Sequence, residues 1–278
     1  MTVMWIAFLL FLLVYFAGGF FVRNATYPAP PIRVSLEPPA TLEVVNLKLP
    51  GGETVVGWLA SDPPLVKRPI VVYFHGNGEN LQTVWASGLF HQWRELAVAC
   101  LVIDYPGYGR STGRPSEVGI REAARMALMW TRQQYPENPM IISGWSLGAA
   151  VAVQAAATNP EHADALILMS GWSTLRDAGH NHFPLWLVQL LVREQYNSLE
   201  AASYVNCPAL VLHGEQDNLI PLSQGQQVAS RLGGTARWIP LAGAGHNDLL
   251  GQSRVWEEIG KFLHELFELQ PSPEMHNP

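Results

Sequence analysis

The sequence has few charged residues and contains no long basic run. Only 14% of its 278 residues are Asp, Glu, Lys or Arg, and the formal net charge is −6. A nucleic-acid partner would require a cluster of Lys and Arg side chains, so we expect no such partner. Apolar residues make up 48% of the chain. This content excludes general disorder and is sufficient for the core of one large domain.

Cysteine is also scarce, with only Cys100 and Cys207 in the whole chain. Each lies beside an apolar run, as small buried side chains do, and two cysteines do not form a disulfide framework. His180 and His182 are close in sequence, but no carboxylate or cysteine follows at the spacing of a metal site. We therefore expect no metal and no organic cofactor.

One long stretch, residues 3–22, contains no charged residue at all. As a helix it would extend about 30 Å, the thickness of the hydrocarbon core of a bilayer. We expect residues 1–22 to form an uncleaved transmembrane anchor. A cleaved signal peptide and a buried core helix remain alternatives, although no basic segment precedes the stretch. Arg23 and Arg33 follow it, which favours a cytoplasmic location for the rest of the chain.

The remaining chain divides by composition. Residues 23–40 include five prolines and are expected to form an extended linker that separates the domain from the membrane. Residues 41–270 are expected to form the main domain, with a cap inserted at residues 172–204. Residues 271–278 are expected to form a flexible tail.

Apolar runs alternate with helical stretches from Ile70 onward, after an expected antiparallel hairpin at residues 41–60. Continuous apolar strands that alternate with helices indicate an α/β fold, with a mostly parallel sheet covered on both faces. The expected strands are residues 69–76, 98–105, 140–146, 163–171, 208–214 and 236–243. The expected helices are residues 80–96, 115–135, 147–159, 223–232 and 248–267.

Polar residues follow several of these expected strands. His75 to Asn77, Ser146, Asp217 and His246 each lie at or just after the end of an apolar run. Ligands of open parallel sheets bind outside the carboxyl ends of the strands. We therefore expect these residues to meet at one edge of the sheet.

The stretch Gly144-Trp145-Ser146-Leu147-Gly148 joins an expected strand to an expected helix. A serine at such an abrupt turn adopts a strained backbone conformation and projects its hydroxyl group over the sheet edge. Glycines two residues before and after it allow the flanking backbones to approach each other. The N–H groups of the first helical turn are suited to a developing negative charge. Ser146 is thus a candidate nucleophile.

A serine hydroxyl needs a base that removes its proton during attack. His246 follows the last expected strand and is the candidate base, and Asp217 is the candidate carboxylate that holds its imidazole. Two N–H groups should stabilise the oxyanion, and we expect them to belong to Leu147 and Asn77. Other carboxylates compete with Asp217, namely Glu215, Asp177 and Asp248, the last of which is expected to cap the final helix.

Four further polar residues are expected to be structural. His75 and His213 both precede a glycine at a strand end, where a histidine usually donates to a loop carbonyl. Asp104 and Ser111 belong to a turn that they are expected to hold by hydrogen bonds.

The motifs "HGNGEN", "DYPGYGRSTGRPSE", "GWSLG", "HGEQDNLIP" and "GAGHND" occur in this order. Together they resemble the α/β-hydrolase-fold serine hydrolases. They are most similar to the membrane-anchored group that includes acyl-protein thioesterases (depalmitoylases) and uncharacterised bacterial hydrolases. The resemblance implies the chain order Ser146, Asp217, His246 and a hydrolase that acts on esters, thioesters or amides. Pro106 departs from the family pattern, in which arginine is more frequent.

We therefore expect a membrane-anchored serine hydrolase that cleaves carboxylic esters or thioesters of small molecules or proteins through an acyl-enzyme. An aminopeptidase or prolyl-peptidase-like amide hydrolase and a non-catalytic membrane scaffold remain alternatives. The cap segment "HFPLWLVQLLV" would either line an acyl pocket and touch the bilayer, or pack as an ordinary cap helix.

Overall fold

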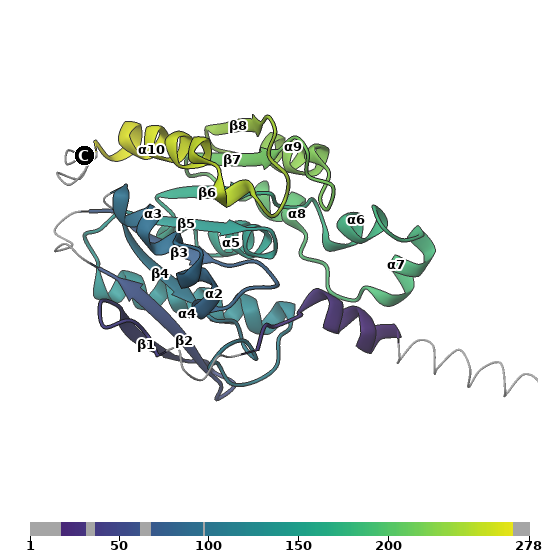
Figure 1. Ribbon diagram of the computed structural model, residues 1–278, viewed down its shortest axis with the longest axis horizontal. Helices are drawn as coiled ribbons and strands as arrows, with labels where there is room; N and C mark the ends of the chain where they lie inside the picture. The colour runs from purple at the N-terminus through teal and green to yellow at the C-terminus, as the bar shows by residue number, and fades with distance from the viewer. Residues whose placement is uncertain (1–17, 32–36, 62–67, 97, 269–278) are drawn as a thin grey trace, which may run out of the picture.

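One sheet of eight strands runs through the molecule (Figure 1). The computed structural model describes residues 18–31, 37–61, 68–96 and 98–268. The strands are β1 (Glu43–Lys48), β2 (Thr54–Ala60), β3 (Ile70–Phe74), β4 (Ala99–Ile103), β5 (Met140–Trp145), β6 (Ala165–Met169), β7 (Ala209–Gly214) and β8 (Ala236–Leu241). Their order in the sheet is β1-β2-β4-β3-β5-β6-β7-β8. Strand β2 is antiparallel to both of its neighbours, and the pairs from β4 to β8 are parallel.

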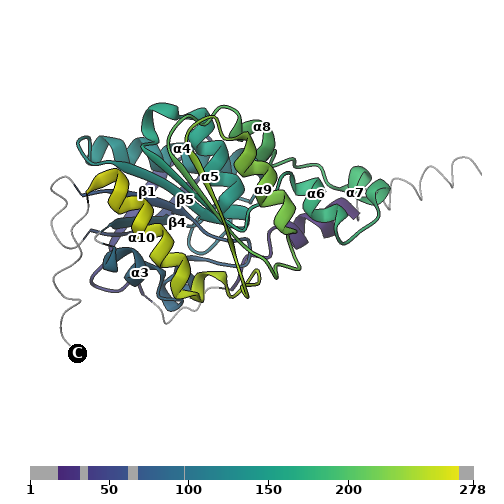
Figure 2. The ribbon, with the colours of Figure 1, turned by 90° about the horizontal axis from the view of Figure 1, so that it is seen from above.

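Helices cover both faces of this sheet, as Figures 1 and 2 show. The helices α4, α5, α8 and α9 pack on one face, and α2, α3 and α10 pack on the other. The bounds are α2 (Leu81–Ala86), α3 (Leu89–Glu95), α4 (Glu117–Gln134), α5 (Leu147–Thr158), α6 (Leu175–His180), α7 (Leu185–Leu191), α8 (Ser198–Ala202), α9 (Leu222–Arg231) and α10 (Ser253–Phe267). Short 3₁₀ turns lie at η1 (Pro160–His162) and η2 (Leu249–Gly251).

The central strands are almost entirely apolar because neither of their faces meets solvent. All residues of β3, β4, β6 and β7 are buried. A parallel sheet covered on both faces favours such uniformly apolar strands. The α/β fold and the antiparallel pairing of β1 with β2, both predicted from the sequence, are confirmed.

Two helix boundaries differ from the prediction. The single helix expected over residues 80–96 is divided into α2 and α3, because Gly88 adopts a φ of 80° that interrupts the helix. The last helix begins at Ser253 rather than Asp248. Asp248 does not cap it and instead accepts the backbone N–H of Gly245 at 2.8 Å. This bond fixes the loop before the helix.

Most of the predicted anchor lies outside the described residues, which begin at Gly18. Residues 18–26 form a helix, so the predicted extended linker at 23–40 is wrong for its first four residues. The helix ends before Pro28, because a proline disfavours helical backbone in the residue that precedes it. Within the part of the chain that is described, no helix is long and apolar enough to cross a bilayer. The tail at 271–278 also lies outside the described residues.

The cap lies between β6 and β7 and contains α6, α7 and α8. The helix of residues 18–26 packs against it, and a side chain at Gly18 would overlap the side chain of Leu191. Just after this helix, the Tyr27 hydroxyl hydrogen-bonds to the Glu194 carboxylate and lies 2.8 Å from the hydroxyl of Tyr196. The N-terminal segment is therefore tied to the cap.

Candidate active site

Ser146 lies at the sharp turn between β5 and α5. Its φ of 58° and ψ of −118° lie in a region that residues other than glycine rarely adopt, which indicates stored backbone strain. A Cβ atom at Gly144 would overlap the backbone of Gly148, and one at Gly148 would overlap the carbonyl group of Phe74. The two glycines therefore allow the strand, the helix and the neighbouring strand β3 to approach closely enough to form this turn.

The loops after β7 and β8 bring two further side chains to Ser146. Nε2 of His246 lies 3.0 Å from Oγ of Ser146, and Nδ1 of His246 lies 2.7 Å from Oδ2 of Asp217. Because an ionised carboxylate only accepts hydrogen bonds, Nδ1 carries a proton and Nε2 can accept one from the serine. The exposed fractions of Ser146, Asp217 and His246 are 4%, 8% and 7%. The three side chains form one chain of contacts that is almost completely removed from solvent.

Several donors hold Asp217 in its ionised form. Its Oδ1 accepts the backbone N–H groups of Leu219 at 2.9 Å and Ile220 at 2.8 Å. Nε2 of His213 lies 3.3 Å from its Oδ2. Burial acts to raise the pKa of Asp217, but the hydrogen bonds from His213, His246 and Ile220 outweigh it and lower the pKa below its usual range. The carboxylate therefore stays charged at neutral pH and can stabilise an imidazolium.

The competing carboxylates lie elsewhere. Asp177 bonds to the hydroxyl groups of its neighbours at the start of α6, Glu215 is exposed, and Asp248 holds its own loop. Asp217 is the one of these four whose carboxylate contacts His246.

The two expected oxyanion donors belong to adjacent segments. Leu147 is the first residue of α5, where a backbone N–H has no acceptor within its own helix. Asn77 lies in the loop after β3, which is held by two bonds. The Tyr108 hydroxyl donates to the Asn77 carbonyl at 2.9 Å, and the Gly76 N–H donates to Oε2 of Glu79 at 2.7 Å. That the N–H groups of Leu147 and Asn77 bind an oxyanion stays a prediction.

Sequence similarity identifies the family of this fold and site. A protein family described as alpha/beta hydrolase fold matches residues 69–191. An uncharacterised protein of Mycobacterium tuberculosis is 32% identical over 232 residues, which cover 82% of this chain and 80% of that protein. The chain belongs to the α/β-hydrolase family. This confirms the family resemblance inferred from the motifs.

Two other similar proteins have names that describe an activity. Lysophosphatidylserine lipase ABHD12 of Danio rerio is 28% identical over 177 residues, which cover 58% of this chain and 46% of the lipase. The chain thus spans about half the length of that relative. An esterase of Pyrococcus furiosus superposes with a TM-score of 0.72 at 18% identity, covering 86% of this chain and 98% of the esterase. At this identity the likeness shows the fold.

Two side chains near the site of this α/β hydrolase were not predicted to contact it. The Trp145 ring centroid lies 5.2 Å from that of His246 with the planes tilted by 35°, so the indole limits the movement of the imidazole. His213 was predicted to be structural. It does lie 2.9 Å from the carbonyl oxygen of Ile220 through Nε2, but it also contacts Asp217. Trp145 occurs within the serine motif, whereas nothing in the sequence indicates where the His213 ring points.

A buried pair lies beneath the loop that carries Asn77. Nε2 of His75 is 3.7 Å from Oδ1 of Asp104, and this oxygen accepts the Leu81 N–H at 2.8 Å. Burial lowers the pKa of His75 to about 4 and raises that of Asp104 to about 7. The Ser111 hydroxyl donates to the Asp104 carbonyl at 2.8 Å, so these residues hold the turn as the sequence predicted.

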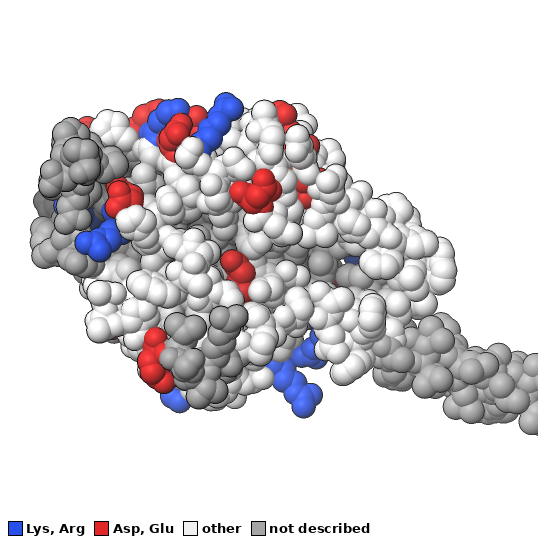
Figure 3. Space-filling model, viewed as in Figure 1, with Lys and Arg blue, Asp and Glu red and all other residues white. Residues whose placement is uncertain are grey.

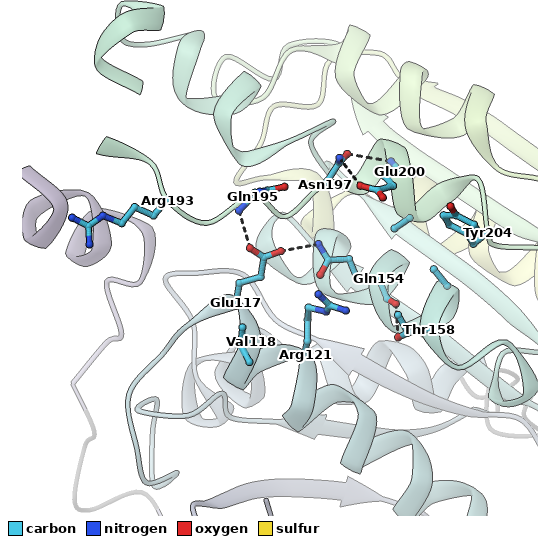
Figure 4. Close-up of a pocket in the computed structure, with 12 residues that line it drawn as sticks. Glu117, Val118, Arg121, Gln154, Thr158, Arg193, Gln195, Asn197, Glu200 and Tyr204 are labelled. Carbon is cyan, nitrogen blue, oxygen red and sulfur yellow. Dashed lines mark hydrogen bonds between the residues drawn. The ribbon is translucent and has the colours of Figure 1, made fainter. Parts of the chain in front are cut away.

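A separate cavity of about 470 Å³ lies where the start of α4 and the second half of α5 meet the end of the cap (Figure 4). The Glu117 carboxylate lines this cavity and accepts the backbone N–H of Gln195 at 2.7 Å. Ser146 does not line this cavity. Gln154, which does, is eight residues further along α5, or about 12 Å. Among the described residues, no group of His, Cys, Asp or Glu side chains is arranged to hold a metal ion.

Proposed function

We propose that the protein is a membrane-anchored serine hydrolase that cleaves carboxylic esters or thioesters through an acyl-enzyme. The observation that carries this proposal is the chain of contacts from Ser146 through His246 to Asp217, at 3.0 Å and 2.7 Å. A nucleophile within hydrogen-bond reach of a base, which is itself oriented by a carboxylate, is the arrangement that acyl transfer requires.

In this mechanism Oγ of Ser146 attacks the substrate carbonyl carbon while Nε2 of His246 takes its proton. Asp217 stabilises the resulting imidazolium, and the N–H groups of Leu147 and Asn77 bind the oxyanion. The tetrahedral intermediate then collapses, and the bond from its carbon to the leaving oxygen or sulfur breaks. The leaving alkoxide or thiolate receives the proton from His246. Water, deprotonated by the same imidazole, then attacks the acyl-enzyme and releases the carboxylic acid. Ser146 regains its proton.

The names of the two similar proteins support ester cleavage, because one is called a lipase and the other an esterase. Thioesters are attacked at the same carbonyl carbon by the same nucleophile, so the proposal includes them.

Covalent labelling tests the role of Ser146. A fluorophosphonate probe should label the wild type and should fail to label Ser146→Ala. The same substitution should lower kcat for p-nitrophenyl esters by a factor on the order of 10⁴ to 10⁶. Equal labelling of both proteins would contradict the proposal, and a folded wild type that neither labels nor hydrolyses esters would favour a non-catalytic scaffold.

We further propose that residues 1–22 attach this domain to the membrane, with the catalytic domain on the cytoplasmic side. The support is the uncharged stretch at residues 3–22, which has the length of a membrane span. The full chain should float with lipid vesicles in a density gradient and resist extraction by carbonate. A reporter fused to the C-terminus should be active only in the cytoplasm.

A further inference from the structure

Exposed aromatic and aliphatic side chains gather on two segments of the molecule. Trp186, Phe183 and Leu185 at the start of α7 and just before it have exposed fractions of 66%, 56% and 46%. Phe20 and Phe21 in the helix of residues 18–26 are 69% and 70% exposed. Single exposed apolar residues are common on protein surfaces, but a contiguous group indicates an interaction site.

These two segments lie at the same end of the molecule, as Figures 1 and 2 agree. The helix of residues 18–26 packs on the end of α7 through Gly18 and Leu191. Its contact side includes Val22 and Thr26, so Phe20 and Phe21 project from the other side of the helix, away from the cap. We call Phe20, Phe21, Phe183, Leu185 and Trp186 the apolar tip.

The segment of the cap that contributes to the apolar tip lacks formal charge. Residues 178–192 contain no Asp, Glu, Lys or Arg, and the outer surface of the α6–α7 end is white in Figure 3. Arg176 and Asp177 precede this segment, and Arg193 and Glu194 follow it. Aromatic side chains combined with nearby arginines are typical of protein surfaces at the interface between lipid and water.

We propose that the apolar tip inserts into the interfacial region of a lipid bilayer. The sequence before the described chain argues for a lipid bilayer as the partner of this surface. Gly18, the first described residue, is in the same helix as Phe20 and Phe21, and residues 3–17 contain no charged residue. The inference rests on the proposed membrane attachment and is independent of the serine chemistry. It adds a second contact, which fixes how the domain is oriented on the bilayer.

This orientation matters for the substrate because the tip is joined to the active-site rim. Nε2 of His182, next to Phe183, lies 2.9 Å from the carbonyl oxygen of Leu219. The backbone N–H of Leu219 in turn donates to Asp217. An inserted tip therefore holds the rim close to the lipid surface, where esters with long acyl chains are concentrated. With the serine chemistry proposed above, esters embedded in the lipid would lie within reach of this rim.

Environment-sensitive fluorophores distinguish lipid from water at the tip. We would attach the fluorophore NBD to the cysteine of Trp186→Cys in the full chain. Cys207, which is partly exposed, would be replaced by serine so that it is not labelled, whereas Cys100 can stay because it is fully buried. The matched control is Leu266→Cys, because Leu266 is also exposed but lies near the end of α10, far from α7 in Figures 1 and 2. Both proteins would be placed in nanodiscs of phosphatidylcholine and phosphatidylglycerol in equal amounts, with and without doxyl-labelled lipid.

Emission from position 186 should shift to shorter wavelength, lose intensity with doxyl lipid and resist iodide, whereas position 266 should be quenched by iodide alone. Iodide quenching at 186 equal to that at 266 would overturn the inference. Shielding of 186 from both quenchers would also overturn it and would indicate a second copy of the chain as the occupant. A wild type that does not float with vesicles would refute membrane attachment, and lost fluorophosphonate labelling would refute only the serine chemistry.

Discussion

Asp217 is a buried carboxylate whose charge depends on the donors around it. His213 is one of them, and its Nε2 also lies 2.9 Å from the Ile220 carbonyl oxygen. The Asp217 carboxylate and the Ile220 carbonyl group are both buried, so the loss of the His213 ring removes a partner from each of them. The ring therefore acts on the candidate site through Asp217.

His213→Leu should lower the free energy of unfolding by about 1–3 kcal/mol. It should also make the stability of the protein begin to fall at a higher pH as the solution is acidified. The folded pKa of Asp217 is depressed, so the contribution of the carboxylate is present above its unfolded pKa and lost as pH falls through the folded pKa. Without His213 that folded pKa rises. Urea unfolding at a series of pH values measures both effects. The control is His91→Leu, since His91 is exposed, and urea midpoints that depend on pH in the same way for the two variants would refute the role of His213.

Asp104 should impose the opposite dependence on pH. Its folded pKa is raised from 3.8 to about 7, so the folded protein keeps a proton that the unfolded chain has lost. Its stabilising contribution is present below the unfolded pKa and is lost as pH rises through about 7. His75, whose pKa is lowered to about 4, contributes the reverse slope.

Comparison of the wild type with Asp104→Asn isolates this effect, because the amide retains an acceptor for the Leu81 N–H and does not titrate. Between about pH 4 and 7, the wild type should lose stability relative to the variant as pH rises, while the slope from His75 is common to both. Urea midpoints at a series of pH values test this. Parallel curves for the two proteins would show that burial does not shift the pKa of Asp104.

Residue roles are predictable from the sequence where the residue lies at the end of a strand or in the loop that follows it. Ser146, Asp217 and His246 lie in such positions, and parallel strands bring these positions to one sheet edge. The contact of His213 with Asp217 is not predictable in this way. Every residue of β7 is buried, so the sequence does not distinguish the two faces of this strand.

At the scale of elements, the turn between β5 and α5 depends on close backbone contact. A methyl group at position 148 would overlap the carbonyl group of Phe74, and backbone atoms do not move aside as a flexible side chain does. Gly148→Ala should therefore destabilise the protein by about 3 kcal/mol or more. Gly251→Ala is the matched control, because no atom lies within 4 Å of the added methyl group. Thermal unfolding compares them, and equal melting temperatures would contradict the packing argument.

The bounds of the elements show which local signals are readable. The strands are short apolar runs and match their predicted positions within a few residues. The break between α2 and α3 is less visible, because a glycine within a helical pattern is often tolerated and only its φ of 80° reveals an interruption. The start of α10 was misplaced because Asp248 resembles an N-cap residue but bonds to its own loop.

At the scale of the whole molecule, α3 and α10 are joined across one face of the sheet. The rings of Trp93 and Trp256 meet at right angles with centroids 5.3 Å apart, and Trp93 is fully buried. Trp93→Ala should lower the free energy of unfolding by about 3–5 kcal/mol. Trp186→Ala, at an exposed position, should change it by no more than about 0.5 kcal/mol. Similar urea midpoints for the two variants would refute this distinction.

The order of the strands is the part of the architecture that the local pattern does not contain. Strand β4 lies between β2 and β3, and nothing in the apolar run of residues 99–103 indicates its neighbours. The motif resemblance supplies what local patterning lacks, because a fold shared by a family fixes the order of its strands.

The tie between Tyr27, Glu194 and Tyr196 has a mechanical consequence. It couples the helix of residues 18–26 to the cap, so that the two move as one body. The domain therefore cannot tilt independently of this helix, because tilting would move the cap with it. Under the proposed membrane attachment, the whole domain would then keep a fixed orientation relative to the lipid.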